Sequence, residues 1–581
     1  MKNFTQKKFL LIFPPLWTIN MPHLALPTLI AQLKNNGFSA KGMDLNIEFF
    51  NFLLDKKYIS KCIKKIEDTY LFLNQNKSFL GKEDTLENKI LNYKYDKLKE
   101  VFENNININK FAEYSSKLIL ELEKLKLKYT DDDFEKLSLI KYSLNKIIYV
   151  CSLAFLPTYI DRRFEYQNGF MSLNLNDIKN IIFDESQNIF LDFYKSKIKE
   201  IQEQNYSYIG ISIGAGSQLI SGLTIANLLR KETNAHINIG GGFFSRVTDG
   251  LLKNPDFFDF FAHSVSYGEG ELSIVELAKY INDQIPIENV HNLIYKKDKN
   301  IIINGESKPV ILSRISNPDY SDYDLGKYYY PQRIIPLQTN RGCYWRKCAF
   351  CSHSYGKTYT VKKIDDLINE IAQNKLKYNV FSYDIIDEAI HPNFLDRFSD
   401  ALIENKLNIN FIINSRFEKE ITSELLQKAY KAGLRTIRWG FETGNKRIFN
   451  LMNKGVVFEK REQILKMAYE AGIRNVVFAI YGFPTEKYEE ALDTLTFLEK
   501  NHKYIQSTSF GEFCLTVKSP IILNPSDYGI VVSDNFDDFS IIRRYTEKNG
   551  LSEEEKQKLK IKFKDILHKY YYNTPKILNK K

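Results

Sequence analysis

The stretch "TNRGCYWRKCAFCSH", residues 339–353, places Cys343, Cys348 and Cys351 in one short loop. The other cysteines stand singly in apolar contexts, which are typical of buried side chains; they are Cys62, Cys151 and Cys514. Six cysteines in 581 residues are too few for a disulfide framework. We therefore expect reduced thiols, and a tight cluster of reduced thiols indicates a metal site.

Three thiolates do not complete a tetrahedral site. A structural zinc ion takes four ligands, and His353 is poorly spaced to be the fourth, because it lies only two residues beyond Cys351. A [4Fe–4S] cluster held entirely by protein takes four cysteines. The economical interpretation is a [4Fe–4S] cluster with one iron left open for a small molecule. A zinc knuckle or an accidental grouping of cysteines is the alternative.

The cysteine loop opens a run of strands that alternate with helices. Six apolar segments have the length and composition of strands; they are "IIPLQTN", "VFSYDIIDE", "INFIINSR", "RTIRWGFE", "RNVVFAIYGFP" and "STSFGEFCLTV". The pattern predicts a partial (β/α)6 TIM-like barrel over residues 335–515, with its chemistry at the C-terminal ends of the strands. A small C-terminal extension is expected at 516–581.

A second alternation of strands and helices precedes the barrel in two parts, residues 8–48 and about 206–285. It predicts an α/β, doubly wound, Rossmann-like domain over 1–285, whose Gly-rich turns lie at the carboxyl edge of the sheet, where such sheets bind ligands. Between the two parts, about residues 51–205 have helical periodicity and are expected to form a mostly helical insertion. Residues 286–334 are expected to form a linker with a small hairpin.

Composition and charge narrow the functional classes. The chain is 44% hydrophobic and 26% charged, and no segment reaches the ~18–20 apolar residues of a membrane span. The apolar start "KFLLIFPP" is expected to be a first strand and not a signal peptide. Lys and Glu are mixed along the chain, and the net charge of +10 is modest for this length. We expect a cytoplasmic protein with no membrane partner and do not favour nucleic acid as a partner.

The cysteine loop resembles the cluster-binding loop of the radical S-adenosylmethionine (SAM) superfamily. Phe350 holds the aromatic position before the last cysteine, and the loop follows the first predicted barrel strand. The spacing here is C-x4-C-x2-C, whereas C-x3-C-x2-C is commonest in the superfamily. The additional residue lies within residues 344–347 and can loop out without moving the thiolates. The resemblance covers about 335–515.

The resemblance implies a binding site for SAM at the ends of the second and third barrel strands. In "DIIDEAI" the superfamily places an acidic residue that faces the methionine amino group, and Glu388 is the choice, with Asp387 beside it. In "NSR" the resemblance assigns Arg416 to the SAM carboxylate, an anion that suits a guanidinium.

The fourth and fifth strands carry further matches. In "AGLRTIRWGFETGNKRIFNLMNKG" the resemblance assigns Glu442 to the SAM ribose or methionyl end, with Gly440 and Gly444 leaving room for the backbone to approach. In "AGIRNVVFAIYGFPTE" it assigns the adenine and the turn beside it to Ile480, Tyr481, Gly482 and Pro484. The implied chemistry is reductive cleavage of SAM to a 5′-deoxyadenosyl radical, with electrons from a donor such as a flavodoxin or ferredoxin.

The first domain resembles the cobalamin-binding domain that precedes many radical SAM barrels. The matching segments are "PHLALPTLIAQLKNNG", "GISIGAGSQ", "INIGGGFF" and "YGEGE". The resemblance assigns the ligand-lining positions to Ser212, Gly216, Ser217, Gly241, Gly242, Gly268 and Glu269. No histidine has an Asp two residues before it, so the D-x-H-x-x-G motif that supplies a lower axial histidine is missing. A nucleotide-binding domain and an empty scaffold are the alternatives.

These features lead to several hypotheses about function. The first is a cobalamin-dependent radical SAM methyltransferase that acts on an unactivated carbon of a natural product, peptide or cofactor precursor. Other radical outcomes, such as cyclisation or ring rearrangement, belong to the same class. An RNA-modifying methylthiotransferase is disfavoured because the N-terminal part lacks the cysteines for a second cluster. A non-catalytic cobalamin or redox sensor is disfavoured because it has no need of a SAM site.

Overall fold

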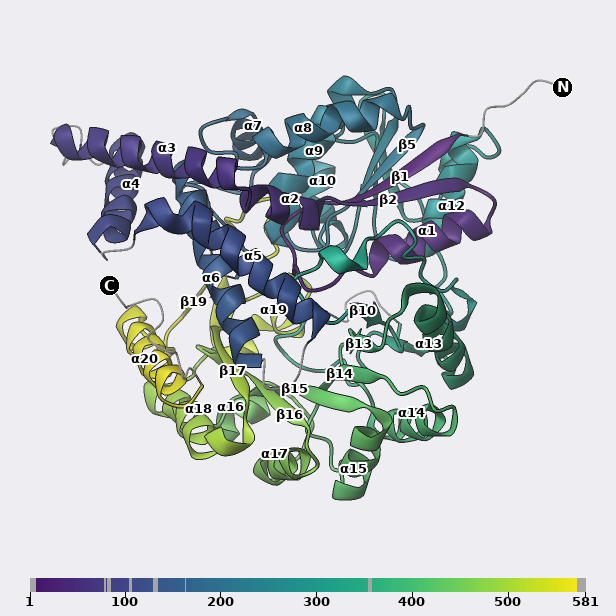
Figure 1. The fold of residues 1–581 in the computed structure, drawn as a ribbon, viewed down its shortest axis with the longest axis vertical. Coiled ribbons are helices and arrows are strands. Elements are labelled where there is room, and N and C mark those ends of the chain that lie inside the picture. The colour runs from purple at the N-terminus through teal and green to yellow at the C-terminus, as the bar shows by residue number, and fades with distance from the viewer. Residues whose placement is uncertain are drawn as a thin grey trace. The chain divides into compact units, whose positions relative to one another are not determined.

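The chain is described here in a computed structural model (Figure 1). The described residues are 7–77, 80, 85–103, 107–128, 134–161, 163–353 and 358–571. They form two compact units: unit 1 consists of Met1–Lys308, Ser316–Arg333 and Asp537–Ser540, and unit 2 of Pro309–Ile315, Ile334–Phe536 and Ile541–Lys581. The end of the predicted C-terminal extension, residues 572–581, lies outside the described residues.

Unit 1 is built on one seven-stranded sheet with the strand order β2-β1-β5-β6-β7-β8-β9. Its strands are β1 (Lys8–Phe13), β2 (Ser39–Asp44), β5 (Tyr208–Ser212), β6 (His236–Gly240), β7 (Ser264–Ser266), β8 (Leu293–Lys297) and β9 (Asn300–Ile303). The first five strands pair in parallel. β8 and β9 add an antiparallel hairpin at the β7 side. The sheet is therefore mixed and not wholly parallel, and residues assigned from sequence to the linker contribute two of its strands.

Helices cover both faces of this sheet (Figure 1). They are α1 (Ala25–Asn35), α9 (Leu219–Glu232), α10 (Thr248–Lys253), α11 (Asp256–Phe260) and α12 (Gly270–Ile281). Phe9, Leu11 and Phe13 of β1 share one buried cluster with α1 and α12. Leu10 and Ile12, which alternate with them along the strand, are fully buried too. A strand that is apolar at every position is typical of a parallel sheet covered on both faces.

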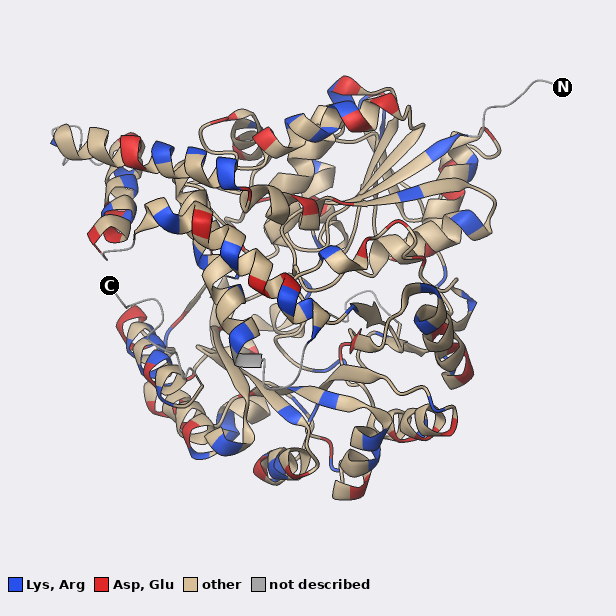
Figure 2. Ribbon diagram, viewed as in Figure 1, with Lys and Arg blue, Asp and Glu red and all other residues tan. Residues whose placement is uncertain are grey.

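The segment between β2 and β5 is mainly helical. It contains α2 (Leu45–Leu53), α3 (Lys56–Gln75), α4 (Leu86–Glu103), α5 (Phe111–Leu127), α6 (Phe134–Ser152), α7 (Leu175–Phe183) and α8 (Leu191–Glu203), with a short pair of strands, β3 (Tyr159–Ile160) and β4 (Tyr166–Gln167). The side chains of Asp44 and Asp55 cap the first two helices by accepting backbone N–H groups. Figure 2 shows acidic and basic residues interspersed along these helices.

Unit 2 contains six parallel strands that pair in chain order. They are β10 (Ile334–Leu337), β13 (Ser382–Ile385), β14 (Asn410–Ser415), β15 (Leu434–Glu442), β16 (Arg474–Tyr481) and β17 (Ser507–Glu512). The connecting helices are α13 (Ile364–Tyr378), α14 (Pro392–Glu404), α15 (Ser423–Ala432), α16 (Lys446–Leu451), α17 (Arg461–Glu470) and α18 (Tyr488–Lys500). Strand and helix alternate throughout, so the predicted α/β fold class with its partial (β/α)6 barrel is confirmed.

The C-terminal extension packs mainly on unit 2. It contains α19 (Pro520–Leu523), α20 (Glu553–Ile566) and a strand pair, β18 (Ile530–Val532) and β19 (Tyr545–Glu547). α20 lies along α18 (Figure 1). The exception is Asp537–Ser540, which belongs to unit 1, where Phe539 stacks on Phe257 with ring centroids 5.5 Å apart. Across the described ranges, no helix combines the length and the apolar character needed to cross a membrane.

Candidate active site

The cysteine loop begins where β10 ends. It passes through β11 (Asn340–Arg341), which pairs with β12 (Thr360–Val361), and turns at Gly342, whose φ of +77° is in the left-handed region. Its second half is a turn in which Cys351 N donates to Cys348 O at 3.2 Å. All three cysteines are partly exposed. The loop thus presents three thiols at the C-terminal end of the first strand.

The backbone reverses once between the first two cysteines of the loop. Arg346 has a φ of +60°, in the left-handed region, and its side chain is exposed. A non-glycine residue rarely adopts this conformation unless the chain must reverse there. This reversal at Arg346 falls within residues 344–347, where the additional residue of the C-x4-C spacing is expected.

The donor set fits an iron–sulfur cluster. Burial raises the pKa of the Cys351 thiol to about 11. Burial also raises the pKa of the Cys348 thiol, and the nearby charges of Lys454 and Arg416 lower it. Within the described part of the chain, no three His, Cys, Asp or Glu side chains converge closely enough to hold a single ion. A cluster takes its thiolates at separate irons, so the three thiols need not converge on one ion to hold it.

Asp387, at the end of β13, is directed at the entrance of the cysteine loop. Its carboxylate accepts the backbone N–H of Thr339 at 2.9 Å and of Asn340 at 3.1 Å, the Asn340 amide Nδ2 at 2.9 Å, and the Thr339 hydroxyl. Burial raises its pKa to about 7, although these hydrogen bonds lower it. Asp387 therefore joins the ends of β10 and β13. Glu388 beside it is half-buried.

Arg416, at the end of β14, reaches the cysteine loop itself. Its Nη1 lies 3.9 Å from Cys348 Sγ, and its Nε donates to Glu418 Oε1 at 2.7 Å. Its Nη2 donates to the carbonyl oxygen of Lys454. The side chain is only 4% exposed. The structure thus places Arg416 beside a thiol, in addition to its predicted position at a strand end.

Glu442 ends β15 in an unusual conformation and forms a buried ion pair. Its φ is +65°, and its Oε1 accepts from Lys454 Nζ at 2.8 Å. A Cβ at Gly440 would lie 2.9 Å from both Glu442 Oε1 and Lys454 Nζ, so glycine leaves space for this pair. Lys454 Nζ also lies 5.9 Å from the centre of the Phe350 ring. Sequence reasoning missed Lys454, because a lone lysine in a polar turn shows no sign of burial.

Arg461 holds the backbone around Glu442. It is 1% exposed, and its Nη1 donates to Thr443 O at 2.6 Å and to Phe441 O at 3.3 Å, one residue to either side of Glu442. The guanidinium lies against the ring of Phe458 at 3.8 Å. Sequence reasoning missed this residue too, since a helical arginine is ordinarily at the surface.

Of the other residues predicted around SAM, Ile480 packs beside the cysteine loop, whereas Gly444 and Tyr481 pack toward the helices. A Cβ at Gly444 would lie 2.5 Å from Asp493 O, so this glycine packs against α18. Tyr481 is buried in a cluster with residues of α18 and α20. Ile480 alternates with it and packs in the cluster that contains Ala349 and Phe350 of the cysteine loop. Gly482 has a φ of +74° and donates its N–H to the buried Glu486, and Pro484 lies in the same turn.

In unit 1, the predicted cobalamin residues lie at the carboxyl ends of β5, β6 and β7. Gly216, Gly242 and Gly268 are exposed, while Ser212, Ser217, Gly241 and Glu269 are half-buried. A Cβ at Gly241 would lie 2.3 Å from Ile213 O, so this glycine is required by strand packing. No such contact exists at Gly216 or Gly242, where the nearest described atoms would be 3.7 and 3.8 Å away.

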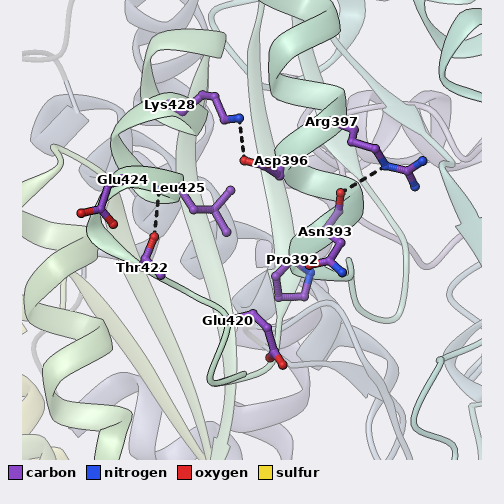
Figure 3. A pocket seen from close by; sticks show the side chains of 9 residues that line it. All are labelled: Pro392, Asn393, Asp396, Arg397, Glu420, Thr422, Glu424, Leu425 and Lys428. Carbon is purple, nitrogen blue, oxygen red and sulfur yellow. Dashed lines mark hydrogen bonds and ion pairs between the residues drawn. The ribbon is translucent and has the colours of Figure 1, made fainter.

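A pocket of about 820 Å³ lies between the N-terminal parts of α14 and α15 (Figure 3). It is lined by Pro392, Asn393, Asp396, Arg397, Glu420, Thr422, Glu424, Leu425 and Lys428. Lys428 Nζ pairs across it with Asp396 at 2.6 Å. These described lining residues include none of the residues assigned above to a cofactor. Neither Asp387 nor Arg416, which lie just beyond β13 and β14, lines this pocket.

The family to which this part of the chain is similar agrees with this arrangement of thiols at strand ends. Residues 337–498 match the radical SAM superfamily, which implies a [4Fe–4S] cluster and SAM. An uncharacterized methyltransferase of Pyrococcus horikoshii is 25% identical over 314 residues. That region covers 52% of this chain and 66% of the relative, so the chain spans slightly less than two thirds of the relative's length.

Two solved structures share the fold. The radical SAM methyltransferase TsrM from Kitasatospora setae, with cobalamin and a [4Fe–4S] cluster bound, superposes with a TM-score of 0.57 at 12% identity and covers 98% of this chain and 93% of its own. The cobalamin-dependent enzyme OxsB, with aqua-cobalamin and SAM bound, has a TM-score of 0.52 at 14% identity, over 64% of this chain and 59% of its own. Residues 337–498 therefore form a radical SAM domain, and the fold of the chain resembles those of OxsB and TsrM.

Proposed function

We propose that this protein is a cobalamin-dependent radical SAM methyltransferase that methylates an unactivated carbon of a small molecule or peptide. One observation carries the radical SAM part: three thiols share the strand ends of unit 2 with Arg416 and the Lys454–Glu442 pair. The methyltransferase part is supported by the name of the Pyrococcus relative and by the fold shared with TsrM.

When bound, the cluster supplies an electron that cleaves a carbon–sulfur bond of SAM, and cobalamin supplies a carrier for a methyl group. The residues of this chain bind and orient these groups. Cys343, Cys348 and Cys351 would hold three irons of the cluster through their thiolates. Arg416 and Lys454 place two positive charges beside Cys348, where they counter the thiolate charge and attract a carboxylate.

Glu442 and Glu388 supply the opposite charge. Their carboxylates suit the ammonium and ribose hydroxyl groups of SAM. Glu442 is 8% exposed and already holds one cation, so the ammonium and carboxylate of the SAM methionyl group would exchange partners with the Lys454–Glu442 pair without leaving a buried charge unpaired. Asp387 fixes the cysteine loop relative to β13 and leaves Glu388 as the acidic group for SAM.

The glycines of unit 1 support a flat ligand. Gly216 and Gly242 have no positive φ and no close neighbour that requires a missing side chain, yet both lie exposed at the carboxyl edge. Bare backbone at such a position suits a macrocycle that lies against it. Because no histidine follows the D-x-H-x-x-G pattern, we propose that cobalamin binds without a lower histidine ligand of that type.

The test is anaerobic reconstitution with iron, sulfide, hydroxocobalamin and SAM, followed by metal analysis and product analysis after desalting. We expect four irons and about one cobalt per chain, with reductant-dependent formation of 5′-deoxyadenosine by analogy to the superfamily. The triple variant Cys343→Ala/Cys348→Ala/Cys351→Ala is expected to lose the iron and keep the cobalt.

Each outcome separates parts of the proposal. Iron without cobalt overturns the cobalamin part and leaves a radical SAM enzyme on a scaffold domain. Zinc in place of iron overturns the cluster. A product with no added methyl group, in a reaction with the natural substrate, overturns the methyltransferase part. A flavodoxin or ferredoxin as reductant, compared with dithionite, tests the proposed electron donor.

A further inference from the structure

Trp345 has no part in the roles assigned so far, yet it contacts the most charged part of the site. Its indole Nε1 donates to Asn453 O at 2.7 Å. Its ring lies against the backbone of Gly455, where a Cβ would approach the ring carbons to 2.0 Å. Gly455 also has a φ of +70°, so both its conformation and its missing side chain suit the indole.

The turn that Trp345 contacts, residues 452–455, carries the groups that face the thiols. Lys454 Nζ pairs with Glu442, and Lys454 O accepts from Arg416. The Arg416 guanidinium lies 4.9 Å from the centre of the Trp345 ring, within the range of a cation–π contact. A single side chain therefore contacts both the turn that carries Lys454 and the second cation of the site.

A second contact joins the same two segments. Ala349 N, between Cys348 and Cys351, donates to Met452 O at 3.0 Å. With the indole bond to Asn453, the cysteine loop is held to consecutive residues of the 452–455 turn. Trp345 can reach this turn because Arg346 takes the left-handed conformation immediately after it.

From these contacts we infer that Trp345 is a positioning residue of the cofactor site, which ties the 452–455 turn to the cysteine loop and so holds Lys454 and Arg416 beside Cys348. The additional residue of the C-x4-C spacing allows the backbone reversal that delivers this side chain. The inference rests on the proposed function for its effect on SAM, whereas the tie between the two segments is a property of the chain itself.

The experiment uses the full chain and the variants Trp345→Ala, Trp345→Phe, Gly455→Ala and Trp345→Ala/Gly455→Ala. Leu376→Gln is the matched control, because Leu376 is 91% exposed on α13. The first readout is amide hydrogen exchange at Ala349 in the protein without cofactors. We expect at least about tenfold faster exchange in Trp345→Ala, with Trp345→Phe between it and the parent.

The second readout is SAM binding to the reconstituted protein, followed by the change that SAM produces in the electron paramagnetic resonance spectrum of the reduced cluster. Trp345→Ala is expected to keep its iron and to bind SAM about tenfold more weakly, the scale of one hydrogen bond and one cation–π contact. Trp345→Phe keeps the ring and is expected to recover part of the binding.

The Gly455 variants test the contact directly. Gly455→Ala is expected to weaken SAM binding about tenfold when Trp345 is present and clearly less in the Trp345→Ala background, because the clash with the indole is then relieved. Equal effects in both backgrounds, or unchanged exchange at Ala349 in Trp345→Ala, would overturn the inference. A parent protein that binds no cluster or no SAM would overturn the proposed function instead, and the exchange experiment would still decide whether Trp345 ties the two segments.

Discussion

Both units contain parallel strands, but the residues at the carboxyl ends of these strands differ in kind. In unit 1 these ends expose glycines such as Gly216 and Gly242, with backbone at the surface. In unit 2 they hold thiols, two buried cations and a buried carboxylate, of which Lys454 and Glu442 form a pair. Bare backbone suits a broad, flat ligand, whereas paired charges suit a small zwitterion. Under the proposed function, the same architecture would hold two kinds of ligand through the residues at its strand ends.

The largest expected effect is at the glycines of unit 1. Gly242→Phe places a ring on the exposed backbone and is expected to weaken cobalamin binding at least about 100-fold, because the ligand and the ring would occupy the same space. The cobalt content after desalting measures this effect. The protein should fold normally, since a Cβ at Gly242 meets no atom closer than 3.8 Å.

Gly242→Ala is the milder control, and the iron content should be unchanged in both variants. Retention of cobalt by Gly242→Phe would mean that cobalamin does not bind against this exposed backbone. The proposed difference in ligand between the two units would then be wrong.

The charged pair of unit 2 provides the next prediction. Lys454→Met leaves the Glu442 carboxylate buried and unpaired, which is expected to lower the free energy of unfolding by about 3 kcal/mol. Urea unfolding of the protein without cofactors measures this loss. The double variant Lys454→Met/Glu442→Gln removes the unpaired charge and should recover most of the stability. Equal stability of the single and double variants would show that the pair is not energetically coupled.

At three glycines an added Cβ would meet another atom closely, but the atom belongs to the backbone at two of them and to side chains at the third. An added Cβ at Gly241 or Gly444 would meet a carbonyl oxygen at 2.3 or 2.5 Å, and we expect each alanine variant to lose about 2 kcal/mol of folding stability. At Gly440 it would meet only the ends of two flexible side chains. Gly440→Ala should therefore change stability little and displace the Lys454–Glu442 pair.

Thermal unfolding and SAM binding separate these cases. Gly440→Ala is expected to weaken SAM binding about tenfold with a nearly unchanged melting temperature. A large loss of stability in Gly440→Ala would indicate that the ion pair cannot move aside.

The smallest expected effect is on pH dependence in unit 1. Burial, with a smaller contribution from the neighbouring His263 and Arg230, lowers the pKa of His236 to about 3. The unfolded chain therefore binds a proton below pH 6.5 that the folded chain does not, so stability from this residue is complete above pH 6.5 and falls as the pH decreases. We expect a loss of about 1 kcal/mol between pH 6.5 and pH 5.5.

His236→Gln, which keeps a polar group near Ser264, should flatten this part of the profile. Denaturant unfolding at several pH values provides the measurement. An unchanged profile in the variant would assign the acid sensitivity to other groups.

The sequence by itself determined the elements and the thiols. A run that is apolar at every position, as in Phe9 to Phe13, requires cover on both faces and therefore predicts a buried parallel strand. Three closely spaced cysteines lie in one loop in any fold, so the thiol donor set was readable without coordinates. The strand ends were predictable because Gly, Asp and Arg directly follow apolar runs.

Only the tertiary structure decided which of these side chains meet. Asp387 and Glu388 are neighbours in sequence, but Asp387 is directed to Thr339 and Asn340. Lys454 is buried because the turn after α16 folds back on the cysteine loop, a long-range contact that leaves no local pattern. Periodicity reports which residues share a face of one element, whereas the partner of a buried charge depends on how separate elements pack.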